Sequence, residues 1–516
     1  MAENFCKYYK LVRQVSYDNG QSWSNTSVTK KGDLYESDSE DCGGAGGGGE
    51  YCPTDATLYR WVRLDPSEEG NYICSGSTKY YKMIKEESND GGYNWEISVP
   101  YQYTRGDVWE TYSEDCGYVP PLGTKLKLYR GDNLSYSADC DSTSAVTSAE
   151  THQIYDYTSF TRVEVGECIN TIGAKSFFGL SGLTSVSFPS ALSTIESDAF
   201  ESCKLISNIE IPNSVKYIGS GAFIYCDGLT SVDIPNGVTN IGMAIGIESD
   251  PDGYNWGTFN GCRSLTSVTI PQTVTALNEN STNQFADCSS LIRITVDGSN
   301  SAYCDIDGVL FNKSQTNLIA YPNMKSTTYT IPNTVRTINR DAFSSCSNLT
   351  SVTIPDSVTT IGKDSFDWCS NIAQFIIPSS VTSIGNRAFH GCRTARSISI
   401  PSTLSTIGDA AFADCGGLTS FEIPTSLTHI SNMCFSYCTS LTSVTIPSNI
   451  TSIGYNAFYE CSGLTSITVN ATTPPTLGSS AFYGSSCPIY VPAASVSTYQ
   501  SASGWSTYAS RIQAIP

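Results

Sequence analysis

A step of 23 residues recurs through the second half of this chain and limits the folds that it can adopt. Cysteine, phenylalanine and proline all keep this step. The positions are Cys346, Cys369, Cys392, Cys415, Cys438 and Cys461, then Phe343, Phe366, Phe389, Phe412, Phe435 and Phe458, then Pro332, Pro355, Pro378, Pro401, Pro424 and Pro447. Because so short a unit cannot enclose a core alone, its copies must stack. The period predicts a solenoid with one continuous apolar interior and an outer surface free for binding, rather than a buried catalytic pocket.

One repeat shows how a turn of the stack is built. Val352 and Ile354 alternate with polar neighbours, which predicts a short strand with one apolar face. Pro355 has no N–H to donate and should end that strand. We expect Val358–Ile361 to carry the chain around the next corner and Phe366 to fill the widest part of the interior.

The repeated phrase Leu-Thr-Ser-Val-Thr-Ile-Pro, followed by Val, Ile-Gly, Ala-Phe and Cys, resembles the BspA-type leucine-rich repeat of bacterial surface proteins. The match is clearest at Leu349–Cys369 and Leu441–Cys461 and extends from about residue 160 to the end. The resemblance implies a curved, right-handed, β-rich solenoid with one strand per repeat, used for adhesion, host attachment or other binding. We therefore expect a mainly β protein: about twelve repeats over residues 161–488, small β-rich N-terminal modules, and a short helical cap over 489–516.

Two inserts interrupt the period, near residues 242–254 and 297–330. The second contains Asp307-Gly308 between apolar runs, which predicts a hairpin turn. The first adds 13 residues between Pro235 and Pro271. Inserts in solenoids form loops on one face, often the binding face.

The first insert and the residue that follows it supply our candidate binding residues. These are Asp250, Asp252, Tyr254 and Trp256. Clustered carboxylates beside aromatic rings suit a lip that contacts a ligand, or a weak cation site. The alternative is a tolerated surface loop without a ligand.

The first 125 residues lack the 23-residue period and contain a different repeat. The pattern Ser-x-Asp-x-Gly-x-x-Trp spans Ser16 to Trp23, with Asp18, and returns 72 residues later from Ser88 to Trp95, with Asp90. It resembles the Asp box of sialidase-like propellers, a structural hairpin turn in which Asp accepts backbone N–H bonds and Trp packs beneath. We predict one β module over residues 1–72, a second over 73–125, and a Ser- and Asp-rich linker over 126–160.

Composition limits the partners. The chain has 49 acidic and 29 basic residues, a net charge of −20, which disfavours nucleic acid and anionic membranes because both need clustered Lys and Arg. No apolar run is long enough to cross a bilayer. The N-terminal residues lack a basic region followed by an apolar core. We expect either that a secretory signal was removed or that the protein is not exported by that route.

Twenty cysteines suggest disulfides, but their positions argue otherwise. Ten of them, from Cys203 to Cys461, occupy one repeat position. Stacked strands lie about 4.8 Å apart, slightly more than the ~3.8 Å between Cβ atoms that a disulfide prefers. We therefore predict a ladder of free thiols. A straight ladder does not make a tetrahedral site either, so we expect no metal and no cofactor.

Catalysis finds little support in the sequence. Of three histidines, His390 and His429 lie in repeats and are interpreted as variable surface residues. No Gly-x-Ser-x-Gly is placed on a strand-turn-helix, and we predict no catalytic residues. A carboxylate pair for glycoside hydrolysis stays open, because proximity in space cannot be inferred from the chain.

These patterns predict a non-enzymatic recognition protein. A solenoid face would bind a cell-surface polysaccharide or a protein receptor, and the N-terminal modules would serve homo-oligomer or virion assembly. The absence of a recognisable signal favours a phage virion component, such as a fibre, over a bacterial surface adhesin. A third alternative is a glycan-active enzyme or its accessory subunit. The expected location is the virion or the extracellular surface.

Overall fold

The computed structural model describes residues 124–140, 144–152, 154, 157–244, 256–278 and 283–516, and before residue 124 only the backbone of strands β1 to β9. The chain divides into two compact units, Met1–Leu122 and Gly123–Pro516. In the described residues no helix is long and apolar enough to cross a membrane.

The strands of the first unit pair in three antiparallel groups. β4 (Leu58–Arg63) pairs with β7 (Met83–Ser88), so stretches that the sequence assigned to separate modules contribute to one sheet. Asp18, Trp23, Asp90 and Trp95 lie outside the described residues. The other strands are β1 (Gln14–Val15), β2 (Ser24–Asn25), β3 (Glu36–Ser37), β5 (Tyr72–Ser75), β6 (Thr78–Tyr81), β8 (Glu96–Ile97) and β9 (Thr111–Tyr112).

The segment interpreted as a linker, 126–160, instead closes the N-terminal end of the solenoid. β10 (Thr124–Arg130) and β11 (Asn133–Asp139) form an antiparallel hairpin, and β10 also pairs with β13 (Arg162–Val165). A disulfide joins Cys140 to Cys168. The polar composition that suggested a linker has a simple cause, because β11 is the exposed edge strand of this sheet. β10 thereby covers the edge of β13, which would otherwise be open to pairing with another chain.

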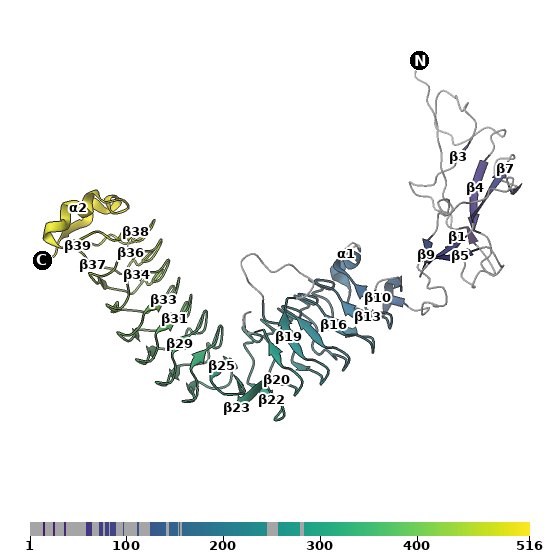
Figure 1. The fold of residues 1–516 in the computed structure, drawn as a ribbon, viewed down its shortest axis with the longest axis horizontal. Coiled ribbons are helices and arrows are strands. Elements are labelled where there is room, and N and C mark those ends of the chain that lie inside the picture. The colour runs from purple at the N-terminus through teal and green to yellow at the C-terminus, as the bar shows by residue number, and fades with distance from the viewer. Residues whose placement is uncertain are drawn as a thin grey trace, which may run out of the picture. The chain divides into compact units, whose positions relative to one another are not determined.

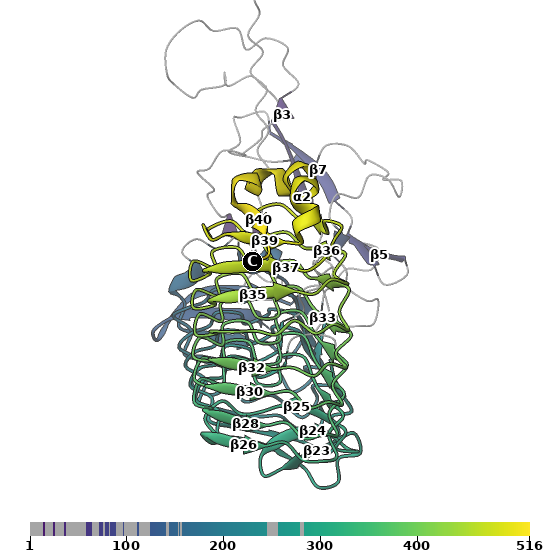
Figure 2. The same ribbon diagram turned by 90° about the vertical axis from the view of Figure 1, so that its left-hand side faces the viewer.

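Most turns of the solenoid contribute strands to two parallel ladders, where one strand per repeat was expected (Figures 1 and 2). In the repeat Leu349–Cys369, β28 (Ser351–Thr353) holds Val352 inward. The residues expected to form a corner include β29 (Thr360–Ile361), which pairs with the equivalent strands of both neighbouring turns. Buried Ile361 therefore lies on a second strand rather than at a corner.

The strands of both ladders recur along the chain with the repeat. The first ladder comprises β13, β15 (Ser185–Ser187), β18 (Ser231–Asp233), β20 (Ser267–Ile270), β22 (Arg293–Val296), β26 (Thr328–Thr330), β28, β30 (Gln374–Ile376), β32 (Ser397–Ser399), β35 (Ser443–Ile446), β37 (Ser466–Val469) and β39 (Ile489–Val491). The second comprises β12 (Ala145–Val146), β14 (Thr171–Ile172), β16 (Thr194–Ile195), β17 (Tyr217–Gly219), β19 (Asn240–Met243), β21 (Ala276–Leu277), β25 (Asn317–Ala320), β27 (Thr337–Ile338), β29, β31 (Ser383–Ile384), β33 (Thr406–Ile407), β34 (His429–Ile430), β36 (Ser452–Ile453) and β38 (Thr476–Leu477). Two short helices, α1 (Ser148–Thr151) and the 3-10 helix η1 (Tyr157–Ser159), lie near the N-terminal end.

The third side of each turn runs around the repeated phenylalanine, and we call these segments, from three residues before each Phe to two after it, the Phe edge. The Phe366 N–H donates to the Ala388 carbonyl of the next turn at 2.8 Å. The residues two before and two after it, Asp364 and Trp368, have φ of 54° and 57°. This left-handed geometry points the backbone toward the neighbouring turn on both sides of the Phe. The Phe edge is therefore a third hydrogen-bonded ladder.

The predicted column of phenylalanines is confirmed. Phe343, Phe366 and Phe389 are fully buried, with ring centroids 4.8 and 5.3 Å apart and planes within 9° of parallel. The column continues through Phe412, Phe435, Phe458 and Phe482, and Tyr321 begins it. An equivalent column joins Phe177, Phe200, Phe223, Phe259 and Phe285.

The second insert separates these two columns. β23 (Tyr303–Ile306) and β24 (Val309–Asn312) form the predicted hairpin, with positive φ at Asp307 and Gly308. The core consists of two buried clusters that meet at β24, where Leu310 belongs to one and Phe311 to the other. The expectation of a single continuous interior is thus corrected: the solenoid has two halves, joined through the hairpin.

The C-terminal cap is confirmed, with one strand added to its helices. After β39 come the 3-10 helix η2 (Ala493–Ser495), α2 (Val496–Ser501), the 3-10 helix η3 (Trp505–Arg511) and β40 (Ile512–Ala514). β40 extends the first ladder by pairing with β39. Buried Trp505 packs on Phe482 and donates from its indole N–H to the Pro475 carbonyl at 2.7 Å. The ring that closes the aromatic column therefore has its one polar group hydrogen-bonded.

All ten ladder cysteines are buried free thiols, as predicted. They are also hydrogen-bond donors, which the sequence did not suggest. Sγ of Cys392 donates to the Phe366 carbonyl at 3.3 Å, and Sγ of Cys415 to the Phe389 carbonyl at 3.2 Å. Each thiol thereby partners a buried carbonyl of the previous turn.

These thiols should resist alkylation in the folded protein. Burial raises the pKa of Cys226 and Cys415 to about 12, and the thiolate is the reactive species. We expect iodoacetamide to label none of the ten within hours at pH 8 in the native state, and all ten after unfolding without reductant. Mass spectrometry of tryptic peptides measures this. Ladder cysteines that stay blocked after unfolding would contradict the assignment.

Candidate functional site

Of the four predicted lip residues, Trp256 lies in the part of the chain that the structure describes. Asp250, Asp252 and Tyr254 lie outside it. Trp256 is 40% exposed and lies on the Phe edge, three residues before Phe259. Its carbonyl accepts the Gly221 N–H at 3.0 Å, which fixes the residue against the previous turn. In the described part of the chain no group of His, Cys, Asp and Glu is arranged to hold a metal ion.

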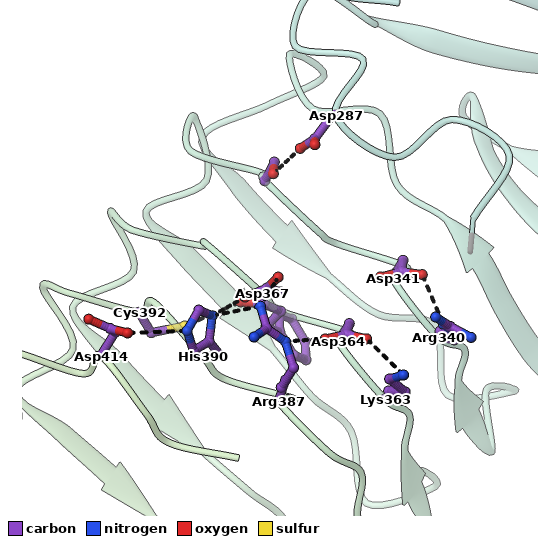
Figure 3. A network of polar contacts seen from close by, with 12 residues as sticks. Asp287, Arg340, Asp341, Lys363, Asp364, Asp367, Arg387, His390, Cys392 and Asp414 are labelled. Carbon is purple, nitrogen blue, oxygen red and sulfur yellow. Dashed lines mark hydrogen bonds and ion pairs between the residues drawn. The ribbon is translucent and has the colours of Figure 1, made fainter. Parts of the chain in front are cut away.

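A charged cluster spans the Phe edge of three successive turns (Figure 3). Its members are Asp364, Asp367, Arg387, His390 and Asp414. Arg387 reaches back one turn and donates from Nε to Asp364 Oδ1 at 2.9 Å and from Nη2 to Asp367 Oδ2 at 3.1 Å. The two bonds point to separate carboxylates, so the guanidinium bridges them rather than clamping one.

The geometry of the cluster shifts the pKa values of Asp364 and Arg387. Burial raises the pKa of Asp364, and neighbouring Asp367 raises it further, while Arg387 opposes both. Burial alone would lower the pKa of Arg387, but Asp367 and Asp364 outweigh it and the pKa is raised. The arginine therefore keeps its charge and holds the two acids together.

His390 is not the variable surface residue that the sequence suggested. It is 91% buried, with Nδ1 2.6 Å from Asp367 Oδ1 and Nε2 3.2 Å from Asp414 Oδ2. Both ring nitrogens face carboxylate oxygens, and Arg387 Nη2 also lies 3.1 Å from Nδ1. The ring thus contacts charged side chains of the turns on both sides and braces them.

A second polar contact joins the Phe edges of the two halves of the solenoid. The Asn283 side chain donates to the Asp341 carbonyl at 3.2 Å, and the Asn283 N–H donates to Asp341 Oδ2 at 3.3 Å. Ser345 also bonds Asp287 across the same joint. Burial, with a smaller contribution from nearby Asp364, raises the pKa of Asp341 to about 7. Its ionised form is thus disfavoured in the folded protein.

Exposed aromatic rings lie further along the Phe edge. We call Tyr437, Tyr459 and Tyr483 the tyrosine row. Its ring centroids are 5.5 Å apart from Tyr437 to Tyr459 and 5.1 Å apart from Tyr459 to Tyr483. The outer two rings are 44% and 55% exposed. Closer to the charged cluster, Trp368 is 37% exposed and carries the Arg393 guanidinium 4.5 Å from its ring centre.

The tyrosine row lies in an almost uncharged part of the chain. Residues 417–516 contain two acids, Glu422 and Glu460, and one base, Arg511. The whole chain has 49 acids and 29 bases. The charged cluster and the tyrosine row therefore give neighbouring stretches of one edge different chemistry.

Sequence reasoning missed both groups, although the repeat register contained a signal. Asp367 and His390 directly follow ladder phenylalanines, as do Tyr459 and Tyr483. Aligning the repeats on Phe would have placed each pair one above the other on adjacent turns. The contacts of His390 with Asp414, and of Asn283 with Asp341 across the insert, depend on three-dimensional placement and carry no such signal.

A small cavity lies inside the solenoid, beside β34. It is lined by Ile407, Phe421, Ile423, Leu427, His429, Ile430, Ser431, Cys434 and Phe435. This lining contains no carboxylate, so the acid and base pair of a glycosidase is not found there.

Comparison with known proteins agrees with this architecture. The description "BspA type Leucine rich repeat region (6 copies)" matches residues 151–245, 255–372, 315–438 and 359–488. The chain belongs to this family. No curated protein sequence matches it.

Several solved structures are similar to the chain. A leucine-rich repeat protein from Eubacterium ventriosum is 26% identical, with a TM-score of 0.59, over 71% of this chain and 94% of that chain. A leucine rich cell surface protein from Faecalibacterium prausnitzii is 24% identical, with a TM-score of 0.41, over 81% and 93%. The pneumococcal vaccine antigen PcpA is 19% identical, with a TM-score of 0.46, over 86% and 97%.

Proposed function

We propose that this BspA-type repeat protein is a non-enzymatic recognition protein that binds a cell-surface glycan or protein through the Phe edge. One observation carries the proposal. The exposed side chains of Trp256, Trp368, Tyr437 and Tyr483, with half-buried Tyr459 between the last two, all lie on this edge, while the phenylalanines behind them fill the interior. Tyrosine and tryptophan supply much of the contact energy in interfaces.

The charged cluster supports binding rather than turnover. Its carboxylates are engaged by Arg387 and His390. A glycosidase needs one acid free to protonate a leaving group and a second free to act as nucleophile or base. We therefore assign this cluster to bracing the turns that present the edge.

Incubation of the full chain with arrays of cell-surface glycans and proteins tests this proposal. We expect saturable binding to at least one class, with no released product by chromatography. Product release would overturn the non-enzymatic assignment, and absence of binding to every class would overturn recognition.

Whether the protein belongs to a phage particle or to a bacterial surface is a further proposal. We propose a phage virion component first and a bacterial surface adhesin second, in the order that the sequence suggested. An antibody against the solenoid should detect the protein in purified virions in the first case and in the cell envelope in the second. Detection in neither would reject both.

A further inference from the structure

We propose that the tyrosine row is a subsite for a neutral polysaccharide, one without carboxylate, sulfate or phosphate groups. This inference rests on the proposed recognition function and names the ligand class for one stretch of the Phe edge. Its support comes from the placement of the rings, from the charge around them and from the rigidity of the turns that hold them.

The rings make a continuous aromatic strip across three turns. Tyr459 packs edge-on against Tyr437 and nearly parallel to Tyr483, with interplanar angles of 69° and 12°. A sugar presents C–H bonds on its flatter faces, and these carry a slight positive charge that favours the negative face of an aromatic ring. The phenol hydroxyls can donate to and accept from sugar hydroxyls. The row thus offers stacking and hydrogen bonding together.

The sequence contains no Lys or Arg between Arg396 and Arg511, and the acids Asp409 and Asp414 lie on the turn before Tyr437. Within residues 417–516 the side chains other than Glu422, Glu460 and Arg511 carry no fixed charge at neutral pH, apart from any proton on His429. An anionic polysaccharide needs Lys or Arg to pair with, and a basic protein needs clustered acids. The Asn456 amide and a third exposed tyrosine, Tyr455, lie on the Phe edge of the same turns, where the Asn432 amide bonds Asp409 Oδ2 and accepts the Tyr455 N–H. This neutral polar surface matches hydroxyl groups.

The rings are held in place before any ligand arrives. The Tyr437 N–H donates to the Tyr459 carbonyl at 2.7 Å, and the Glu460 N–H donates to the Tyr483 carbonyl at 2.8 Å. Behind the rings, Phe435, Phe458 and Phe482 form part of the buried column. Tyrosine loses little conformational entropy on binding, and a fixed backbone lowers that cost further.

Affinity electrophoresis of the full chain tests the inference. The probes are three neutral polysaccharides (dextran, mannan and xylan) and two anionic ones (alginate and hyaluronan). We expect a neutral probe to retard the protein, with an affinity that changes less than about twofold between 0.05 and 0.5 M salt because no ion pairs form. Tyr483→Ala should weaken that affinity about tenfold, the scale of one lost aromatic contact. Tyr483→Phe should retain most of it.

The control is Tyr217→Ala, which removes a tyrosine of similar exposure, 43%, from β17 in the other half of the solenoid. It should leave the affinity unchanged, and the melting temperatures of all variants should agree. Retention of wild-type affinity by Tyr483→Ala would overturn the inference. So would binding to anionic probes alone or to protein partners alone, although both would leave the recognition function standing. No binding to any glycan or protein would overturn both.

Discussion

Replacing Phe389 by alanine should lower the free energy of unfolding of the solenoid by about 3–5 kcal/mol, the range for a large aromatic side chain lost from a core. Phe389 is fully buried between Phe366 and Phe412, at centroid distances of 5.3 and 5.6 Å. Phe375 meets it edge-on at 4.8 Å. The substitution would therefore leave a cavity between Phe366, Phe375 and Phe412. The adjacent turns cannot move in to fill it without breaking their backbone hydrogen bonds.

Urea unfolding followed by circular dichroism measures this loss. The matched control is Leu205→Ala, because Leu205 is 57% exposed and its loss should change stability by no more than about 0.5 kcal/mol. Equal effects of the two substitutions would mean that the phenylalanine column does not hold the turns together.

Replacing Asp341 by asparagine should stabilise the protein at pH 8 by on the order of a few kcal/mol and leave it nearly unchanged at pH 4. The pKa of Asp341 is raised to about 7 in the folded state, mainly by burial, whereas the unfolded residue ionises near pH 4. Between these values the folded protein binds more protons than the unfolded chain, so stability falls as pH rises from about 4 to 7. Asparagine removes this penalty.

Two features make asparagine a suitable test. Its amide oxygen can still accept the Asn283 N–H that Asp341 accepts, and asparagine tolerates the left-handed backbone, where Asp341 has φ of 53°. Thermal unfolding at pH 4, 6 and 8 should show a flatter pH profile for the variant, while exposed Asp356→Asn keeps the wild-type profile. A variant that is less stable than wild type at pH 8 would contradict the buried, unfavourable carboxylate described at the joint.

The repeat made most of the solenoid predictable, because each copy reports the same environment. Phe343, Phe366 and Phe389 had to share one interior position, and the structure places them in one column. The second ladder was harder to foresee. Most of its strands, such as Thr360–Ile361, are two residues long, too short to establish an alternating pattern.

The remaining differences arise where contacts bridge residues far apart in the chain. Polar β11 is a strand because β10 pairs with it, and β10 pairs in turn with β13. His390 is buried because Asp367 and Asp414 come from the turns on either side. The hairpin of the second insert was predicted, but its division of the core depends on how Leu310 and Phe311 face opposite clusters.

Deletion of one whole repeat tests most directly whether interchangeable stacked turns build this protein. Removing residues 402–424 takes out one period, so that Pro401 is followed by the equivalent of its own next residue. We expect this variant to form a folded solenoid, with native-like circular dichroism and a somewhat lower melting temperature. Removing residues 402–413, about half a period, should disrupt folding around the cut, because the shortened turn cannot align its strands or its phenylalanine with the turns on either side. If both deletions had the same effect, whether both folded or both failed, the stacking of equivalent turns would be contradicted.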